Sequence, residues 1–318
     1  MLEIPISSAP EAPVLVIGAA GTDIVGRLRS DLRPQTSTPA QIRSSFGGVA
    51  RNVAENLARL GQPVSMMTVV GEDERGDQLI SCLLESGVNL DAVLRTSQYA
   101  TGAYLAVVNQ AGELEFGLDD MRTINYLTPD YIRQHEALFR EASILFIDAN
   151  IPKDVLRTVM SLARRARLTV CADPTSSGLA SRLKPYLSRL YLITPNSTEA
   201  AVYCDIDRKI AGRKRALEAA QNLVSQGVKI AIITMGEQGL CYATSETTGY
   251  IPAMRIEVID PTGAGDALTA AVIFALLNDI PLDDAVRLGV SAASLTLKYR
   301  GAVVPDLSLE KLYDQLVI

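Results

Sequence analysis

Short apolar runs recur along the chain and alternate with stretches that have helical spacing. The first run, VLVIG at 14–18, is apolar throughout and ends in glycine, which is typical of a strand buried on both faces. Further strands are predicted at 64–70, 144–147, 169–172, 191–193 and 230–234, and helices at 49–60, 78–85, 153–167, 178–188 and 213–226. Strands that alternate with helices form βαβ units. The pattern therefore predicts an α/β fold with a mostly parallel central sheet and helices on both faces.

Two polar insertions do not fit this sheet. The first, at about 24–45, contains Pro34 and Pro39. The second, at about 97–122, contains a hairpin pattern around a turn at 110–113. We expect both insertions to form a small β-sheet lid over the edge of the central sheet.

The sequence DPTGAGD at 260–266 combines a turn, three small residues and a carboxylate, and it directly precedes an apolar helical segment at 267–277. Helix N-termini carry unpaired N–H groups and a partial positive charge, and small residues at 263–265 would let an anion approach those donors. A carboxylate beside a bound phosphate is repelled by it. Such a position is therefore useful only if the carboxylate accepts a proton from a hydroxyl that attacks the phosphate. Asp266 is therefore a candidate base for phosphoryl transfer. The alternative is a Pro-Gly turn whose acid only caps the helix.

Other candidate residues follow directly after predicted strands, at the edge where α/β folds place ligands. They are Asp23 after the first strand, Asn150 in DAN at 148–150, Asn196 and Glu199 in NSTE at 196–199, and Thr234, Gly236 and Gly239 in TMGEQG at 234–239. An acid such as Asp23 binds hydroxyl groups, the pair at 196–199 suits waters on Mg²⁺, and the segment at 234–239 suits backbone contact with a nucleotide. The structural alternatives are a turn residue for Asp23 and a capping box for 196–199.

The helix predicted at 49–60 starts after Gly47 and Gly48 and stops at Gly61. The diglycine lets backbone N–H groups meet a small ligand, and Asn52, one turn into the helix, is placed to reach the same ligand. The alternative is a glycine-led helix with a surface asparagine.

Composition narrows the function classes. The 318 residues, 48% of them hydrophobic, allow a substantial core. A net charge of −6 with no basic stripe predicts no nucleic-acid partner. The four cysteines form no CxxC pair, which argues against zinc and disulfides and suits the cytoplasm. No stretch is long enough to span a membrane, and residues 1–8 lack the pattern of a signal peptide.

His135, the one histidine, lies in an ordinary helical pattern at 129–139, so we expect it on a helix surface with no catalytic role.

The motifs together resemble the PfkB-type carbohydrate kinase family, which has the ribokinase-like fold. The match covers nearly the whole chain, and its carriers are Gly47-Gly48 with Asn52, ARLG at 58–61, Pro195-Asn196 with Glu199, Thr234 with Gly236 and Gly239, and DPTGAGD at 260–266. A P-loop kinase is excluded because the sequence GxxxxGK[ST] is absent. The resemblance implies a single kinase domain over 1–318, built as a three-layer αβα sandwich with a small β-sheet lid, and an alcohol group as phosphate acceptor.

The resemblance also implies a role for each site residue. Asp266 would be the catalytic base and Gly263, Ala264 and Gly265 the anion hole; Asp23, Gly47, Gly48, Asn52 and Asn150 would hold the acceptor; Asn196, Glu199, Thr234, Gly236, Gly239 and Ser294 would form the ATP side. Glu199 would act on Mg²⁺ through water, and Asp260 and Thr262 match the positions at which members bind a monovalent cation such as K⁺. Lids often pair between subunits in this family, so a homodimer is implied.

Within the family, 47–56, 118–121 and 148–150 look most like the pseudouridine kinases, which transfer the γ-phosphate of ATP to the 5′-hydroxyl of the C-nucleoside. Asn150 stands where ribose-specific members often carry Glu, which favours a nucleoside over free ribose. One departure is Gly21, because many members have Asn at that position. The alternatives are a kinase for ribose, adenosine or a hexose, a nucleoside-binding protein without turnover, and a dinucleotide-dependent oxidoreductase, for which the GxGxxG fingerprint is missing.

Overall fold

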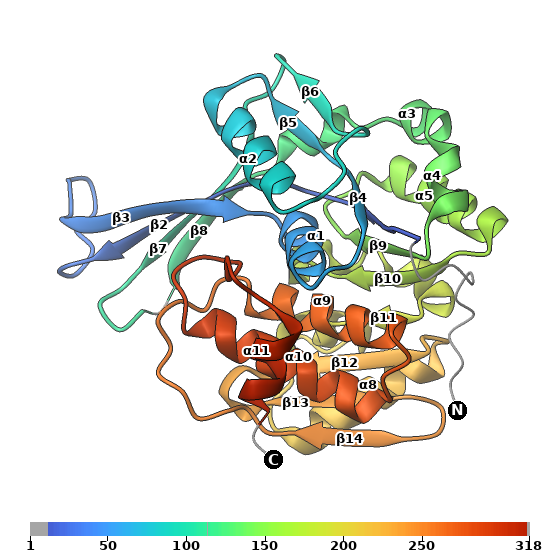
Figure 1. The fold of residues 1–318 in the computed structure, drawn as a ribbon. Helices are drawn as coiled ribbons and strands as arrows, with labels where there is room; N and C mark the ends of the chain where they lie inside the picture. The colour runs from blue at the N-terminus through green and yellow to red at the C-terminus, as the bar shows by residue number, and fades with distance from the viewer. Residues whose placement is uncertain (1–11, 113, 317–318) are drawn as a thin grey trace.

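An eight-stranded sheet forms the centre of the computed structural model, which describes residues 12–112 and 114–316 (Figure 1). In spatial order its strands are β14 (Thr248–Ile251), β13 (Leu240–Ala243), β12 (Ile230–Thr234), β11 (Leu192–Ile193), β10 (Thr169–Asp173), β9 (Ile144–Asp148), β1 (Val14–Ile17) and β4 (Val64–Met67). Pairing is parallel from β4 to β12, and β13 and β14 add antiparallel strands at one edge. Every residue of β1, β4, β9 and β10 is buried, because helices cover both faces. The predicted mostly parallel sheet is confirmed.

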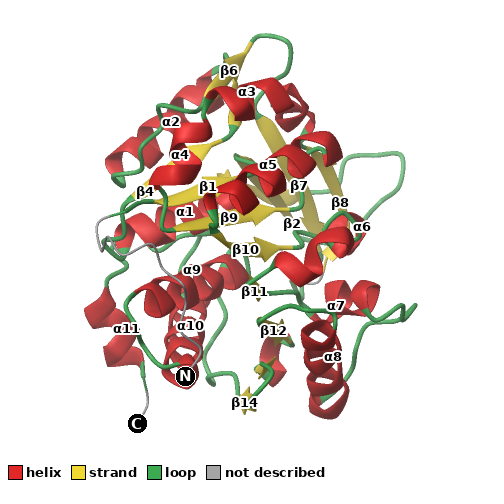
Figure 2. Cartoon of the chain, turned by 90° about the vertical axis from the view of Figure 1, so that its right-hand side faces the viewer, coloured by secondary structure: helices red, strands yellow, loops and turns green. Residues whose placement is uncertain are grey.

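Two helical layers cover this sheet (Figure 2). One layer contains α3 (Pro129–Gln134), α4 (Glu136–Glu141), α5 (Lys153–Ala166), α6 (Ser177–Ala180), α7 (Ser197–Tyr203) and α8 (Arg213–Ser225). The other contains α1 (Val49–Arg59), α2 (Glu74–Glu85), α9 (Ala264–Leu277), α10 (Leu282–Leu297) and α11 (Leu309–Gln315). Strand β1 serves both cores: Leu15 and Ile17 pack with the first layer, and Val14 and Val16 with the second. The fold is the three-layer αβα sandwich that the resemblance implied.

The polar insertions form a second sheet that projects from the main body (Figure 1). Its order is β3 (Ala40–Gly47), β2 (Gly21–Leu28), β7 (Gly102–Val108) and β8 (Leu114–Asp120). The expected small sheet is therefore confirmed, and we call it the lid sheet below. A further two-stranded sheet pairs β5 (Val69–Gly71) with β6 (Leu94–Thr96). Glu113, in the predicted turn, and residues 1–8, where no signal peptide is expected, lie outside the described residues.

Several predicted elements differ in extent. The strand expected at 64–70 divides at Thr68, so that β4 stays in the central sheet and β5 leaves it. The helix expected at 178–188 divides into α6 and the 3₁₀ helix η2 (Lys184–Arg189), because Pro185 lacks the N–H that a continuous helix needs. Two more 3₁₀ helices, η1 (Arg122–Tyr126) and η3 (Gly236–Gln238), connect other elements. Strands β6, β13 and β14 and helices α10 and α11, for which the sequence pattern makes no prediction, complete the fold.

His135 separates two helices instead of lying within one. Helix α3 ends at Gln134 and α4 begins at Glu136, and His135 Nδ1 lies 3.0 Å from the Tyr131 carbonyl oxygen. The imidazole also packs against the Tyr131 ring, with 4.3 Å between the centroids. Local packing thus accounts for this histidine. None of the helices in the described part of the chain is long and apolar enough to cross a membrane.

Candidate active site

The start of α9 is fixed by a glycine that no other residue can replace without strain. The helix begins at Ala264, earlier than the apolar pattern at 267–277 suggests, and its N-cap Gly263 has a φ of 78° in the left-handed region. A Cβ at Gly263 would come within 2.2 Å of the Ala302 carbonyl oxygen. The N–H of Ala267 donates to the Gly263 carbonyl, so the N–H groups that precede it have no helical acceptor. This helix start has the geometry that suits an anion.

Asp266 in the first turn of α9 is held by Asn52 of α1. The Asn52 Nδ2 donates a 2.7 Å hydrogen bond to Asp266 Oδ2. Burial raises the pKa of Asp266 to about 7, the hydrogen bond from Asn52 opposes that rise, and the charges of Asp23 and Asp148 add to it. A carboxyl group that titrates near neutral pH suits general base chemistry, because its proton affinity is close to that which the reaction needs.

A cavity of about 430 Å³ opens beside Asp266, and we call it the acceptor cavity after the role that the resemblance implies for its lining residues. Asp23, Gly48, Asn52 and Asn150, all predicted to hold the acceptor, line it. Gly47 lies behind its wall, where a Cβ would come 2.3 Å from the Asp23 carboxylate. Burial raises the pKa of Asp23 to about 6, although the charge of Arg51 lowers it. The sequence motifs around Asp23, Asn52 and Asp266 therefore meet at one hollow.

A second cavity, of about 240 Å³, lies on the other side of the motif at 260–266, and we call it the nucleotide cavity after the role that the resemblance implies for its lining residues. Thr234, Gly236, Gly239 and Ser294, to which the resemblance assigns the ATP side, line it together with Ala264 and Gly265. A Cβ at Gly265 would meet no atom within 4 Å, so this glycine borders open space. Thr262, Gly263 and Asp266 face the acceptor cavity. The motif is therefore the wall that the two cavities share.

Asn196 and Glu199 form a capping box at α7 and line neither cavity. The Asn196 side chain accepts from the Thr198 and Glu199 N–H groups, and Glu199 Oε2 accepts from the Asn196 N–H at 2.8 Å. This is the structural alternative that the sequence left open. Glu199 nevertheless lies close to a buried acid of β10, Asp173, whose pKa is raised well above its usual range by burial and by the Glu199 charge.

Asp260 faces a cation of the chain itself. Its Oδ1 accepts a 3.0 Å hydrogen bond from the Thr262 N–H, and its Oδ2 lies 3.8 Å from Arg43 Nη2 of β3. A guanidinium group therefore stands near the carboxylate at which the resemblance implies a monovalent cation. Within 12–112 and 114–316, no group of three or more His, Cys, Asp or Glu side chains is arranged to hold a metal ion.

Part of the acceptor cavity has no assigned role in the sequence analysis, although Asp119 and Met121 lie in the segment 118–121 that resembles the pseudouridine kinases. Tyr104 and Asp119 line it from β7 and β8, and Met121 follows β8 directly. The register pairs Asp23 with Tyr104 and Tyr104 with Asp119, so these three side chains share one face of the lid sheet. Strand alternation gives the signal for this face, but only the observed register shows which residues lie opposite each other. Thr175, Ser176 and Leu179, which follow β10, complete the wall.

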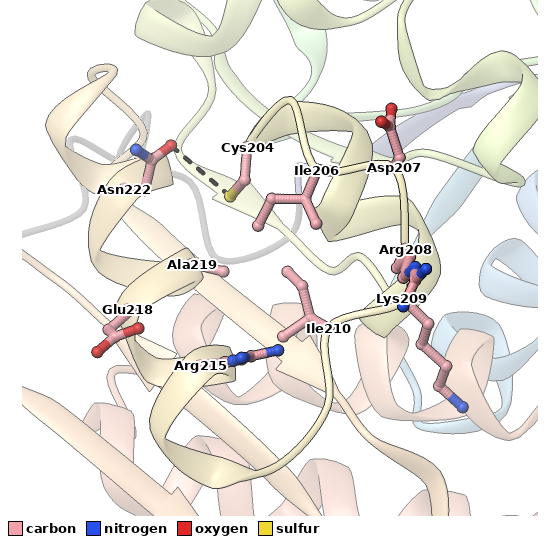
Figure 3. Close-up of a pocket in the computed structure, with 10 residues that line it drawn as sticks. All are labelled: Cys204, Ile206, Asp207, Arg208, Lys209, Ile210, Arg215, Glu218, Ala219 and Asn222. Atoms are coloured by element: carbon pink, nitrogen blue, oxygen red, sulfur yellow. Dashed lines mark hydrogen bonds between the residues drawn. The ribbon is translucent and has the colours of Figure 1, made fainter.

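A hollow of about 630 Å³ lies elsewhere, between α7 and α8 (Figure 3). Its polar lining includes Arg208, Lys209 and Arg215, and Cys204 Sγ lies 3.8 Å from Asn222 Oδ1. None of the predicted site residues lies there. Size alone therefore does not identify the functional cavity.

Comparison with known proteins decides the class to which this site belongs. The family model described as pfkB family carbohydrate kinase matches residues 12–308. The chain belongs to this kinase family. The pseudouridine kinase of Escherichia coli K12 is 30% identical over 297 residues, which cover 93% of this chain and 94% of that protein. As a pfkB carbohydrate kinase, the chain is a phosphotransferase with an alcohol group as acceptor.

Solved structures support the same fold. The ribokinase of Arabidopsis thaliana, complexed with ribose and ATP, has a TM-score of 0.82 at 21% identity and covers 96% of this chain and 99% of its own. An E. coli structure described as a ribokinase II in complex with ATP and Mg²⁺ has a TM-score of 0.81 at 18% identity and also covers 96% of this chain and 99% of its own. The ribokinase-like fold expected for this pfkB kinase is thereby confirmed.

Proposed function

We propose that this pfkB kinase transfers the γ-phosphate of ATP to the primary hydroxyl of a nucleoside, and that its acceptor is pseudouridine. The observation that carries the proposal is the position of Asp266 on the wall between the two cavities, where it accepts a hydrogen bond from Asn52. A hydroxyl in the acceptor cavity and a phosphate in the nucleotide cavity would meet at this residue.

Asp266 acts as the base in this proposal. The hydroxyl attacks the γ-phosphorus in line while Asp266 takes its proton, and the bond between that phosphorus and the bridging oxygen of ADP breaks. In a loose transition state the proton leaves late, so a carboxylate is basic enough. Negative charge on the transferred group is held by the N–H groups at the start of α9.

The nucleotide cavity suits ATP. Leu240, Leu268 and Leu297 provide apolar surface for a flat base, and Gly265 and Gly236 have no atoms within 4 Å of a Cβ position, which leaves the backbone accessible to phosphate. The ribokinase of A. thaliana was solved with ATP, which supports the same donor here.

Mg²⁺ bound with the nucleotide would neutralise charge on the β- and γ-phosphates. The described residues offer no cluster of three acidic, histidine or cysteine ligands, which fits a metal held by phosphates and water. Glu199 is the residue that we propose to act through such a water. A monovalent cation fits less well, because Arg43 already faces Asp260, and we assign it no step.

The residues that line the acceptor cavity on its lid side favour a nucleoside as the acceptor. Asp119 is a carboxylate that faces the cavity and can accept hydrogen bonds from the N–H groups of a base, which free ribose does not have. Pseudouridine keeps a second ring N–H because its glycosidic bond is made to carbon. The E. coli relative that is 30% identical is a pseudouridine kinase, which supports this acceptor further.

The glycine at position 21 leaves room for an apolar side chain in the wall of the acceptor cavity. A Cβ at Gly21 would come 2.5 Å from the Gly102 carbonyl oxygen, and one at Gly102 would come 2.6 Å from Met121 Sδ. These paired glycines therefore leave room for Met121, which lines the acceptor cavity. Where many related kinases would place an asparagine, this pocket has an apolar wall.

We further propose that the lid sheet closes the site and joins two subunits. Its face opposite Asp119 carries an apolar row: Leu118 is 61% exposed, Phe116 41% and Ile42 72%. An exposed apolar surface of this kind suits a second copy of the chain. The four cysteines are free thiols, which suits a reducing compartment such as the cytoplasm.

Transfer of labelled phosphate from ATP to pseudouridine, uridine and ribose, measured side by side with Mg²⁺, tests the proposal. We expect the highest kcat/KM with pseudouridine. A preference for ribose or for another nucleoside would retain the kinase and replace the acceptor. No transfer to any hydroxyl acceptor would overturn the proposed function.

A further inference from the structure

Arg51 is a buried cation beside the active site to which the mechanism above gives no role. The residue is 3% exposed and lies in α1 directly before Asn52. Its Nη1 donates to Asn52 Oδ1 at 2.5 Å, and its Nη2 lies 2.9 Å from Glu55 Oε2. The guanidinium also stands 5.8 Å from the centre of the Phe46 ring. A continuous set of contacts therefore joins Glu55, Arg51, Asn52 and Asp266.

The chemistry of this chain of contacts is directional. A guanidinium group has only donors, so the end of the Asn52 amide that faces Arg51 must be the oxygen. The nitrogen end then faces Asp266, and it can only donate. If the amide were free to turn over, its oxygen could accept a hydrogen bond from a protonated Asp266. Fixing the amide therefore favours the ionised carboxylate over the protonated acid.

Charge acts in the same direction. Carboxyl groups lie near Asp266 on three other elements. The charges of Asp23 on β2 and Asp148 on β9 favour its protonated form, and the charge of Asp266 in turn raises the pKa of Asp173 on β10. Arg51 is the cation that opposes them. Loss of Arg51 would remove both the opposing charge and the constraint on Asn52.

We propose that Arg51 is a positioning residue for phosphoryl transfer, which orients the Asn52 amide toward Asp266 and keeps that carboxylate ready to accept a proton. The inference rests on the proposed role of Asp266 as the base. It adds a residue that touches neither cavity and acts through Asn52.

The chain offers a matched control. Glu55 pairs with Arg51 on one side and with Arg59 on the other, where Arg59 Nη2 lies 2.6 Å from Glu55 Oε1. Both arginines lie in α1 and both pairs span one helical turn, but Arg59 makes no contact with Asn52. Arg59→Gln therefore disturbs the same buried acid without releasing the amide.

The experiment is the pH dependence of kcat/KM for the acceptor in wild type, Arg51→Gln, Arg51→Lys and Arg59→Gln. In Arg51→Gln we expect the acidic limb to move up by about one pH unit, the lower end of the effect of a nearby opposite charge, with the rate recovering at high pH. Arg51→Lys should restore part of the shift, and Arg59→Gln should follow wild type. An unmoved limb in Arg51→Gln, or an equal shift in Arg59→Gln, would overturn the inference.

Two further measurements separate the possible failures. If Arg51 acts through Asn52, Arg51→Gln should change the profile less in an Asn52→Ala background than in wild type, and an equal change in both would contradict the positioning role. If Arg51→Gln does not fold, judged by its thermal transition, Arg51→Lys decides through the same profile. Asp266→Asn tests the base itself: full turnover in that variant would remove the proposed function, whereas an inactive Asp266→Asn with an unshifted Arg51→Gln removes only this inference.

Discussion

Asn52 and Asp266 stand 214 positions apart in the chain, and a 2.7 Å hydrogen bond joins their side chains. The bond links α1, which follows Gly47 and Gly48, to α9, which begins within the motif at 260–266. Two motifs that lie far apart in the sequence therefore meet at the carboxylate of Asp266.

The rate should depend on pH through the ionisation of Asp266. Burial raises the pKa of Asp266 to about 7, and only the ionised form accepts a proton, so kcat/KM should rise with pH through about 7 and then level off. Because the charge of Asp23 contributes to this rise, Asp23→Asn should move the limb to lower pH even if it weakens acceptor binding. Rate profiles at saturating ATP check both results. A profile that is flat through neutral pH would contradict the assignment.

Alanine substitutions at two glycines of the motif at 260–266 should have different effects, one on stability and one on ATP binding. Gly263→Ala places a side chain at a φ of 78° and against the Ala302 carbonyl, so we expect a loss of about 1–3 kcal/mol in the free energy of unfolding. Gly265→Ala meets no atom within 4 Å, so it should fold normally and raise the KM for ATP, because its methyl group enters the nucleotide cavity. Denaturant unfolding and ATP kinetics on the pair measure this. Equal stability of both variants would argue against the strained N-cap.

Asp119 should distinguish nucleosides from ribose. Asp119→Ala removes the carboxylate that we propose to accept the base N–H, so kcat/KM for pseudouridine should fall about 10–100-fold, as expected for a hydrogen bond to a charged group. Transfer to ribose should change little. The ratio of the two rates is the measurement, and an equal loss with both acceptors would show that Asp119 does not contact a base.

The lid sheet should hold two subunits together. Leu118→Glu introduces a charge into the exposed apolar row, and we expect it to convert a dimer into monomers in light scattering. Leu84→Glu is the matched control, because Leu84 is 56% exposed on α2, outside the lid sheet. If wild type is a monomer, or if both variants remain dimers, the lid sheet is not the interface.

The sequence predicts those parts of the fold in which local pattern and tertiary burial agree. Strand β12 has the predicted bounds, since its apolar run is buried as the pattern suggests. The small residues at 263–265 also mark a helix start in the sequence, although α9 begins at Ala264, before the apolar pattern at 267–277. The split at Thr68 could not be predicted in this way, because both halves of 64–70 are equally apolar and only pairing separates them.

The remaining features of the site depend on contacts between distant segments, which the sequence alone does not predict. Asn196 and Glu199 satisfy both a capping box and a family motif, and one sequence cannot distinguish these interpretations. Tyr104 and Asp119 reach the acceptor cavity only through the register of the lid sheet. Arg51 looks like an ordinary charged helix residue, and only the packing of α1 against the sheet and α9 buries it beside Asp266.

The most direct test of the account is phosphate transfer from ATP to pseudouridine by wild type and by Asp266→Asn, each with ATP binding measured on the same sample. The account predicts that kcat falls about 10²–10⁴-fold, the span usual for a general base, while ATP binding stays near the wild-type value. Wild-type turnover by Asp266→Asn would contradict it.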